Sequence, residues 1–153
     1  MRKLLAVIVL TLIPSLASAQ EGYAGVQFGA GFLSGLVAAP VSAQVGFEVA
    51  PMIDVRADLG FYLTGTGIQF GANGLGKFDL ASATPVTAYG GGGPRVLLDS
   101  NGGGAVFGLG GLGGAEYMLT DQVGVFGEGG FDVFFAGLAV SIFKLGAGAN
   151  FHF

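Results

Sequence analysis

The sequence contains no cysteine, few charged residues and, beyond residue 19, no long apolar run. Cysteine is absent from all 153 residues, so disulfide bonds, which often staple small secreted domains, cannot stabilise this chain. Only 10% of the residues are charged, whereas 52% are hydrophobic. Because a soluble domain usually carries about 25% charged residues, this composition excludes an ordinary water-facing surface.

A helical membrane protein is excluded by the same composition. After residue 19, no stretch reaches the roughly 18 consecutive apolar residues that mark a transmembrane helix. Glycine makes up 31 of the 153 residues, and each glycine weakens a helix by about 1 kcal/mol relative to alanine. The other structure that satisfies every backbone hydrogen bond within a membrane is a closed β-barrel. The composition therefore favours an all-β transmembrane barrel.

Residues 1–19 have the features of a secretory signal peptide. Arg2 and Lys3 precede an apolar run that is too short to span a membrane, and Ala17 and Ala19 fit the small-residue rule for cleavage. We expect cleavage after Ala19, which leaves residues 20–153 as one barrel domain.

The remaining chain alternates between apolar and polar residues with the period of two that strands require. Residues 41–50 and 53–63 alternate on either side of a short turn at Pro51 and Met52, which is typical of an antiparallel hairpin. Each run has about 10 residues, the length of a tilted transmembrane strand. Similar runs cover residues 23–32, 68–80, 86–95, 105–117, 123–132 and 138–153. The sequence therefore predicts an eight-stranded antiparallel up-and-down barrel.

The connections carry two further predictions. Asn73-Gly74 is typical of a hairpin turn, but the arms would be too short to span, so a β-bulge is expected there. Loops on the external side of the membrane, at the end opposite the termini, are expected near residues 33–40, 64–67, 99–103 and 133–137. All are short, whereas long charged loops would indicate an adhesin.

Alternate residues of a strand point to opposite faces, so each predicted strand has one set of apolar positions (the apolar phase) and one set of polar positions (the polar phase). Every charged residue of the predicted strands falls on the polar phase. These residues are Glu48, Asp54, Arg56, Asp58, Lys77, Asp79, Arg95, Glu116, Glu128, Asp132 and Lys144. The interior of an eight-stranded barrel is just wide enough to be filled by side chains. The charges are therefore expected to form a packed interior ion network, with Arg56 near Glu48, Asp54 and Asp58, rather than to line a channel.

The phenylalanines follow the opposite phase. Of the 14 phenylalanines, all but Phe126, Phe134 and Phe135 fall on the apolar phase, which is expected to face lipid. Phe134 and Phe135 are instead expected in the last loop, where they would anchor the barrel at the membrane interface or contact a hydrophobic ligand.

Two features could indicate catalysis or cofactor binding, and neither has the required context. The stretch from Gly108 to Gly113 matches G-x-G-x-x-G, but it lies within one predicted strand instead of between a strand and a helix. His152 is the only histidine. To act as a general base it would need a nucleophile and an orienting carboxylate beside it. A single histidine in a chain without cysteine also disfavours a structural zinc site. We expect no enzymatic activity, no cofactor and no metal.

Gly148, Phe151 and Phe153 resemble the C-terminal recognition signal of outer-membrane β-barrel proteins, although Gly146 stands where that signal has a polar residue. The whole architecture resembles the small eight-stranded outer-membrane proteins of the OmpA-barrel, OmpX and opacity type. The resemblance implies an integral protein of the bacterial outer membrane, with outer-membrane lipid as its surroundings. It also implies contact with the barrel-assembly machinery through the C-terminal strand.

The function expected from the sequence is a structural or interaction role in the cell envelope, performed by a monomer that binds no nucleic acid. One alternative is a carrier of small hydrophobic molecules that opens laterally, which an apolar tunnel in the external half would favour. Another is a lipid-modifying enzyme, which a serine and a histidine in one cleft would favour. A secreted, soluble glycine-rich β protein is the remaining alternative.

Overall fold

The computed structural model describes residues 21–33, 36–63, 67–80, 85–99 and 104–153, so the expected cleavage site at Ala17 and Ala19 lies outside the described residues. No helix in these segments is long and apolar enough to cross a membrane. The strands are β1 (Gly22–Leu33), β2 (Leu36–Ala38), β3 (Pro40–Ala50), β4 (Ile53–Tyr62), β5 (Gly67–Asp79), β6 (Val86–Asp99), β7 (Ala105–Met118), β8 (Val123–Ala136) and β9 (Leu138–His152).

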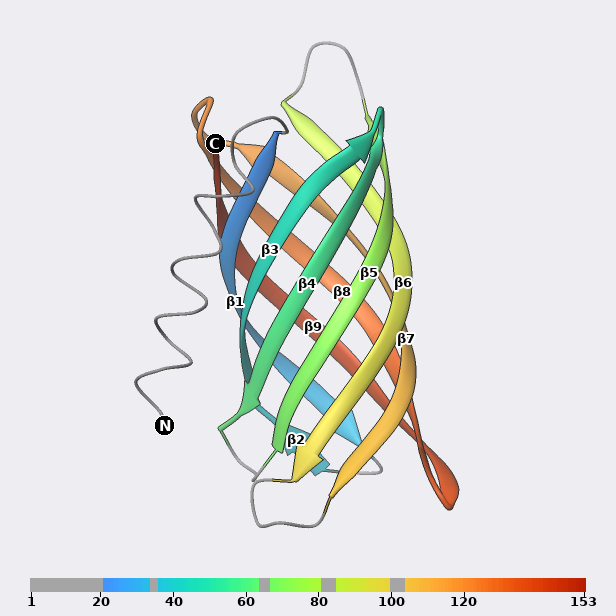
Figure 1. Ribbon diagram of the computed structural model, residues 1–153. Coiled ribbons are helices and arrows are strands. Elements are labelled where there is room, and N and C mark those ends of the chain that lie inside the picture. The colour runs from blue at the N-terminus through green and yellow to red at the C-terminus, as the bar shows by residue number, and fades with distance from the viewer. Residues whose placement is uncertain (1–20, 34–35, 64–66, 81–84, 100–103) are drawn as a thin grey trace, which may run out of the picture.

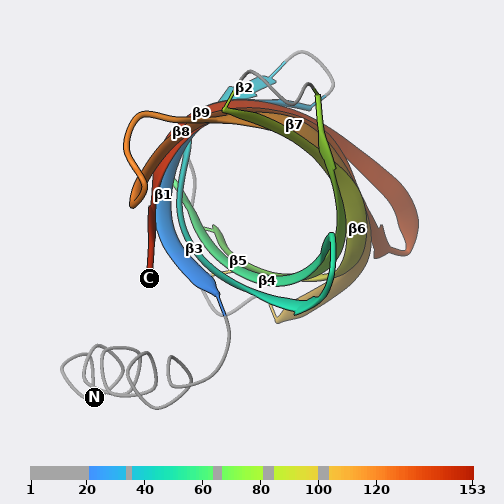
Figure 2. The ribbon, with the colours of Figure 1, turned by 90° about the horizontal axis from the view of Figure 1, so that it is seen from above.

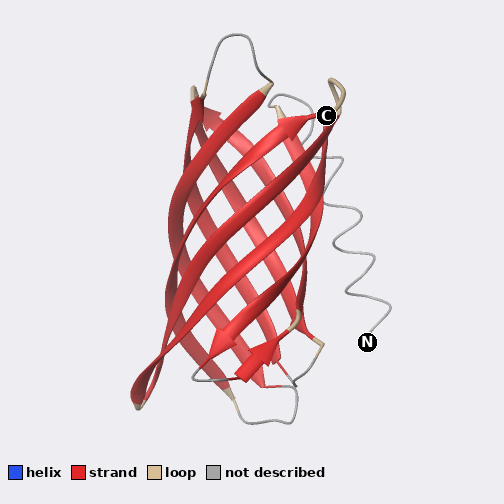
Figure 3. Cartoon of the chain, turned by 180° about the vertical axis from the view of Figure 1, so that it is seen from behind, coloured by secondary structure: helices blue, strands red, loops and turns tan. Residues whose placement is uncertain are grey.

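These strands form one closed antiparallel barrel. Neighbours pair in chain order, and β1 closes the ring by pairing with β9 from Tyr23 opposite His152 to Phe32 opposite Phe143. Figure 1 shows the tilt of the strands, Figure 2 shows the closed ring from above, and Figure 3 shows the wall of strands from behind. Closure pairs the backbone N–H and C=O groups within the wall, as a hydrocarbon environment requires. The predicted antiparallel all-β barrel is confirmed.

The predicted count of eight long strands is also confirmed, although nine strands are assigned in the described part of the chain. β2 and β3 are two parts of the same strand, because they pair with β1 in one register, with Phe28 opposite Val41 and Gly31 opposite Ala38. The break falls beside Pro40, which has no N–H to donate to a ladder. Much of the loop predicted at residues 33–40 is therefore paired backbone.

The two ends of the barrel differ in what they carry. We call the end that holds Gly22 and Phe153 the terminal end, which is at the top of Figure 1, and the other end the loop end. The backbones of Gly22 and Phe153 exchange two hydrogen bonds, Gly22 N to Phe153 O at 3.1 Å and Phe153 N to Gly22 O at 2.9 Å. The alternation of the sequence up to Phe153 therefore corresponds to a strand that is paired along its full length.

The β-bulge predicted at Asn73-Gly74 is wrong. The register of β5 against β4 is unbroken across this dipeptide, and the Asn73 side chain points into the lumen, where it is buried. The dipeptide fits a regular strand because it supplies one polar inward position and one small outward position. A register shift occurs in β3 instead, between Glu48 and Ala50.

The loop predicted at residues 133–137 is also wrong. β8 continues to Ala136 and β9 begins at Leu138, so the connection is a tight turn around Gly137. The φ angle of Gly137 is 77°, a conformation that glycine adopts without steric cost. Phe134 is consequently a strand residue that faces the lumen at 2% exposure, whereas Phe135 faces outward at 59%.

The two phases of the alternation face opposite sides of the wall. Outward-facing side chains such as Phe28 and Phe107 are more than half exposed, whereas inward-facing Arg56 and Asp132 are buried. A large apolar outer surface around a charged interior is the arrangement of a transmembrane barrel and the reverse of a soluble one.

Candidate functional site

The charged side chains that face the lumen are joined in ion pairs. Most of the charged residues expected in the interior pair with one another, as Arg56–Asp58, Arg56–Glu128, Lys77–Glu48, Lys77–Asp54, Arg95–Asp132 and Lys144–Asp132. Two of the expected residues have other partners. Glu116 lies 3.0 Å from Nε2 of His152, and Asp79 accepts a hydrogen bond from Thr87 at an exposed position.

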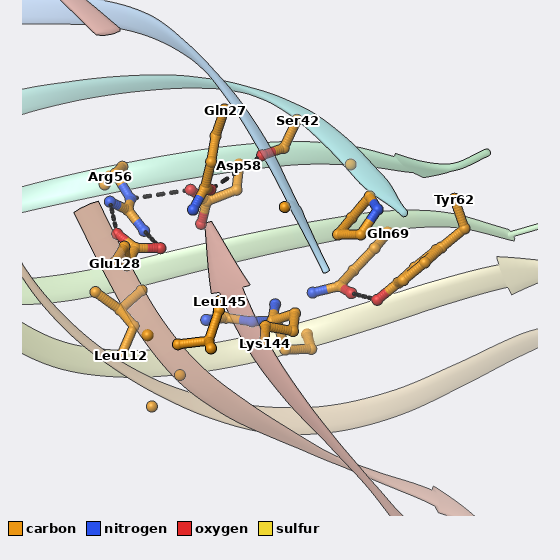
Figure 4. A pocket seen from close by; sticks show the side chains of 17 residues that line it. Gln27, Ser42, Arg56, Asp58, Tyr62, Gln69, Leu112, Glu128, Lys144 and Leu145 are labelled. Carbon is orange, nitrogen blue, oxygen red and sulfur yellow. Dashed lines mark hydrogen bonds and ion pairs between the residues drawn. The ribbon is translucent and has the colours of Figure 1, made fainter. Parts of the chain in front are cut away.

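Arg56 on β4 reaches across the lumen to Glu128 on β8. Its Nη1 lies 2.7 Å from Oε2 of Glu128 and its Nη2 lies 3.2 Å from Oε1, while Nε lies 2.9 Å from Oδ1 of Asp58 (Figure 4). Three strands of the ring separate β4 from β8 on one side, and on the other side lie β9, β1 and the strand formed by β2 and β3. The pair therefore spans the full width of the barrel, and its two-point contact fixes the orientation of both groups.

The partners of Arg56 differ in part from the predicted grouping. Asp58 lies beside Arg56, as expected, but Glu48 and Asp54 pair with Lys77. Sequence alone could not separate these groupings, because all these residues share one phase, and the direction in which each side chain leans decides the pairs.

Asp132 on β8 is the centre of a second group, closer to the loop end. Its carboxylate oxygens lie 3.0 Å from Nε of Arg95, 2.6 Å from Nζ of Lys144 and 2.8 Å from Nε2 of Gln69, which donates a hydrogen bond. Tyr62 donates in turn to Oε1 of Gln69 at 2.6 Å, as Figure 4 shows. Asp132, which has no exposed surface, thus receives donors from three strands.

Amide side chains that the sequence analysis did not single out complete the network. Asn73 accepts a hydrogen bond from Nη2 of Arg95 at 2.7 Å and donates one to Asp58, so it links the group around Asp132 to the group around Arg56. Gln44 donates to Oδ1 of Asn150 at 2.7 Å. The signal that could have found these amides is their phase, because each lies on the inward face of its strand.

Burial makes the network sensitive to the loss of any member. The Arg56 and Arg95 side chains are each 3% exposed. Taking an ion out of water costs several kcal/mol, and attraction offsets this cost only where the remaining hydrogen bonds are made. The network therefore specifies one arrangement of the interior, and a single unpaired member would be strongly destabilising.

Glycines on adjacent strands make room for the large interior side chains. A Cβ atom on Gly46 would lie 2.3 Å from the ring of Tyr23, its partner across the ladder. A Cβ on Gly110 would lie 2.2 Å from Oδ1 of Asp132. The same relation pairs Tyr89 with Gly114, Phe126 with Gly148 and Phe134 with Gly108. A narrow barrel can hold these rings because the neighbouring strand presents no side chain beneath them.

Two cavities adjoin the Arg56–Glu128 pair. The larger, of 350 Å³, lies at the terminal end between residues such as Tyr23, Leu75 and His152. The smaller, of 60 Å³, lies toward the loop end and is the pocket drawn in Figure 4. Arg56 lines both cavities, so its pair with Glu128 lies between them.

The surroundings of His152 differ from those of a catalytic base. Its Nε2 lies 3.0 Å from Oε1 of Glu116, and its ring lies 5.5 Å from that of Tyr23. Ser42 lines the smaller cavity, whereas His152 lines the larger one, and Ser141 is exposed on the outer face. Among the serines that the structure describes, none shares a cavity with His152.

The other residues considered for chemistry lie within strands. The stretch from Gly108 to Gly113 is entirely inside β7, so the strand-to-helix turn of a dinucleotide site is not formed there. Within the described segments, no group of three or more histidine, cysteine or acidic side chains is arranged to hold a metal ion.

The residues that resemble an assembly signal lie on both faces of β9 and at Phe153, which directly follows it. Gly148 lies under the ring of Phe126 on the inner side. Phe151 and Phe153 are exposed on the outer side, and Phe153 packs edge-on against Phe47, with 6.4 Å between ring centroids. Both aromatic rings therefore lie on the outer surface at the terminal end.

A closed eight-stranded barrel with a charged interior and an apolar exterior defines the class of small transmembrane β-barrels. No protein-family model matches this chain, and no curated protein sequence matches it. Among solved structures, it is similar to Neisserial surface protein A, with 19% identity and a TM-score of 0.68 over 88% of this chain and 97% of that chain.

Two further solved structures show the same fold. One is a de novo designed transmembrane β-barrel, with 14% identity and a TM-score of 0.61 over 86% of this chain and 95% of that chain. The other is the N-terminal β-barrel domain of OprF from Pseudomonas aeruginosa, with 14% identity and a TM-score of 0.59 over 87% of this chain and 100% of that chain. The expected resemblance to small outer-membrane barrels is confirmed. The designed barrel is about as similar to this chain as the OprF barrel is, so similarity of this degree establishes the fold and not a biological role.

Proposed function

We propose that this chain is a non-enzymatic integral protein of the bacterial outer membrane, with a structural or interaction role in the cell envelope and a barrel that does not conduct ions. The observation that carries the proposal is the Arg56–Glu128 pair across the lumen. Ion conduction needs a continuous aqueous path, and here two bonded charges occupy the middle of the lumen. The group around Asp132 fills the next layer toward the loop end.

The proposed location rests on the outer surface and on the resemblance. The outward side chains are apolar along the strands, and aromatic residues such as Phe153 lie near the strand ends, where membrane barrels carry aromatic girdles. In this proposal residues 1–19 are removed on export. Gly148, Phe151 and Phe153 are read by the barrel-assembly machinery, and the monomeric barrel is surrounded by outer-membrane lipid.

The interior gives less support to the two alternative functions. A carrier of hydrophobic molecules needs an open apolar path, but the apolar side chains inside the loop end are packed, with Phe134 2% and Ile142 8% exposed. A lipid-modifying enzyme needs a nucleophile beside its base, and the polar partner of His152 is Glu116.

Planar-bilayer recording of the purified protein tests the proposal. Single insertions should give no stable conductance above that of a protein-free bilayer. A steady current from wild-type insertions would refute the closed interior and would favour a transport function. Cell fractionation combined with heat-modifiable gel mobility tests the location, and recovery of the folded protein in a soluble fraction would refute it.

A further inference from the structure

The larger cavity has the size and the closed inner end of a binding site. Its volume of 350 Å³ falls within the roughly 300–1,000 Å³ of small-molecule sites. We call it the vestibule; Asp54, Leu75, Tyr89, Glu116 and Met118 are among its lining residues. Because Arg56 and Glu128 close the lumen beyond it, a molecule entering from the terminal end would be held there and not passed through.

The vestibule carries more negative than positive charge. The ammonium group of Lys77 is shared by Glu48 and Asp54, which leaves this group of three with one net negative charge. Glu116 accepts a hydrogen bond at Oε1 from the neutral amide Nδ2 of Asn150 at 2.9 Å, and Nε2 of His152 lies 3.0 Å from the same oxygen. A cleft of one sign between low-dielectric walls concentrates ions of the opposite sign.

Within the described residues, Asp54 has a single side-chain donor, which it shares with a second carboxylate. Its side chain is 6% exposed and lines the vestibule. Oδ1 is buried, and its contact with Lys77 is an ion pair that lacks the geometry of a good hydrogen bond. In the described part of the chain, its polar contact is Nζ of Lys77 at 3.0 Å, which Glu48 shares. Because buried carboxylates normally accept several hydrogen bonds, Asp54 still has acceptor capacity for a ligand.

The arrangement of the lining suggests the shape of that ligand. Asp54 on β4 and Glu116 on β7 come from strands with β5 and β6 between them. The rings of Tyr23 and Tyr89 and the apolar side chain of Leu75 also line the space. We propose that the vestibule binds a small linear diamine, with one ammonium group at Asp54, the other at Glu116 and the alkyl chain against the tyrosine rings and Leu75.

Isothermal titration calorimetry on the full barrel, in zwitterionic detergent micelles, tests this proposal with 1,4-diaminobutane as the probe. Saturable binding of one molecule per barrel is expected. Butylamine, with one ammonium group, should bind about tenfold more weakly, since a hydrogen bond to a charged group contributes about that factor. The neutral 1,4-butanediol should give no saturable heat.

Matched variants separate the vestibule from general surface charge. Glu116→Gln should weaken diamine binding about tenfold, and Asp54→Asn should act similarly as an independent second variant. Asp121→Asn removes an acid from the exposed turn at the same end, which does not line the vestibule, and should leave the affinity unchanged. Heat-modifiable mobility of each variant shows whether the barrel is folded.

Three results would overturn the inference: no saturable heat with millimolar 1,4-diaminobutane, equal weakening by Asp121→Asn, or equally tight binding of butylamine. This inference goes beyond the proposed function and can fail separately from it. Conductance reports on the Arg56–Glu128 closure, whereas calorimetry reports on the vestibule.

Discussion

Asp132→Asn is the substitution to which the interior network should be most sensitive. The change keeps the shape of the side chain and removes its charge, so Arg95 and Lys144 both lose their anionic partner. The two cations differ in access to water, since the Lys144 side chain is 27% exposed and that of Arg95 only 3%. Lys144 can recover part of its hydration, whereas Arg95 retains Asn73 and the backbone of Pro94 as acceptors.

The expected loss of stability follows from the number of cations that stay buried without a counter-ion. Breaking a buried pair costs about 3–5 kcal/mol, and the substitution leaves one deeply buried cation without its counter-ion. We therefore expect the free energy of unfolding to fall by about 3–5 kcal/mol, not by twice that amount. Asp79→Asn is the matched control, because Asp79 is exposed and contacts the hydroxyl of Thr87; its effect should stay within about 0.5 kcal/mol.

Urea titration of the barrel in lipid vesicles, followed by circular dichroism, measures both changes from the transition midpoints at constant slope. The double variant Asp132→Asn with Arg95→Gln should recover part of the loss, because it removes the unpaired cation. If Asp132→Asn lowered the free energy of unfolding no more than Asp79→Asn, this expectation would be wrong. The buried ion pairs of Asp132 would then contribute no more to stability than an exposed hydrogen bond.

Other predictions concern the wall and its end. Leu145→Arg places a charge at the middle of β9 on the lipid face, where Leu145 is 50% exposed, and should cost about 2–4 kcal/mol in vesicle titrations; a loss under about 1 kcal/mol would contradict the orientation of the wall. Gly46→Ala should cost about 1–3 kcal/mol because its Cβ would overlap Tyr23. Gly127→Ala, which meets nothing within 4 Å, should be neutral or stabilise by about 0.5 kcal/mol, and equal effects of the two glycine substitutions would refute the packing argument. Phe153→Ala should refold from urea with a loss of about 1–2 kcal/mol but reach the outer membrane poorly in cells, and normal outer-membrane levels would count against the proposed assembly signal.

Sequence reasoning recovers the wall of this barrel well because a period of two is a strong signal. A strand that is one residue out of register would turn its charges toward lipid, so the alternation around Arg56 or Lys144 fixes which side faces inward. The residue types typical of turns predicted the structure less reliably than this alternation did. Asn73-Gly74 is a pair of residues typical of turns, yet it forms part of the regular strand β5. Asn73 suits the polar inner face of the wall, and Gly74 suits the outer face.

The partners within the lumen could not be predicted in the same way. The Arg56–Glu128 contact depends on which strands face each other and on how far each side chain leans over the next strand, and neither appears in the phase of one strand. The glycine under Tyr23 is a related case. A glycine on the polar phase shows that space is needed, but only the register between strands identifies Gly46 as the position that provides it.

The salt bridge across the lumen also constrains the order of assembly. Arg56 and Glu128 are 72 positions apart in the chain, so their contact must wait until the intervening hairpins have formed and the two walls face each other. In a partly built sheet Arg56 would keep Asp58 on its own strand, but Glu128 would lack its guanidinium partner, which is costly in hydrocarbon. Joining β1 to β9 and neutralising the interior are therefore coupled, and insertion should proceed as one cooperative step with few stable half-barrels.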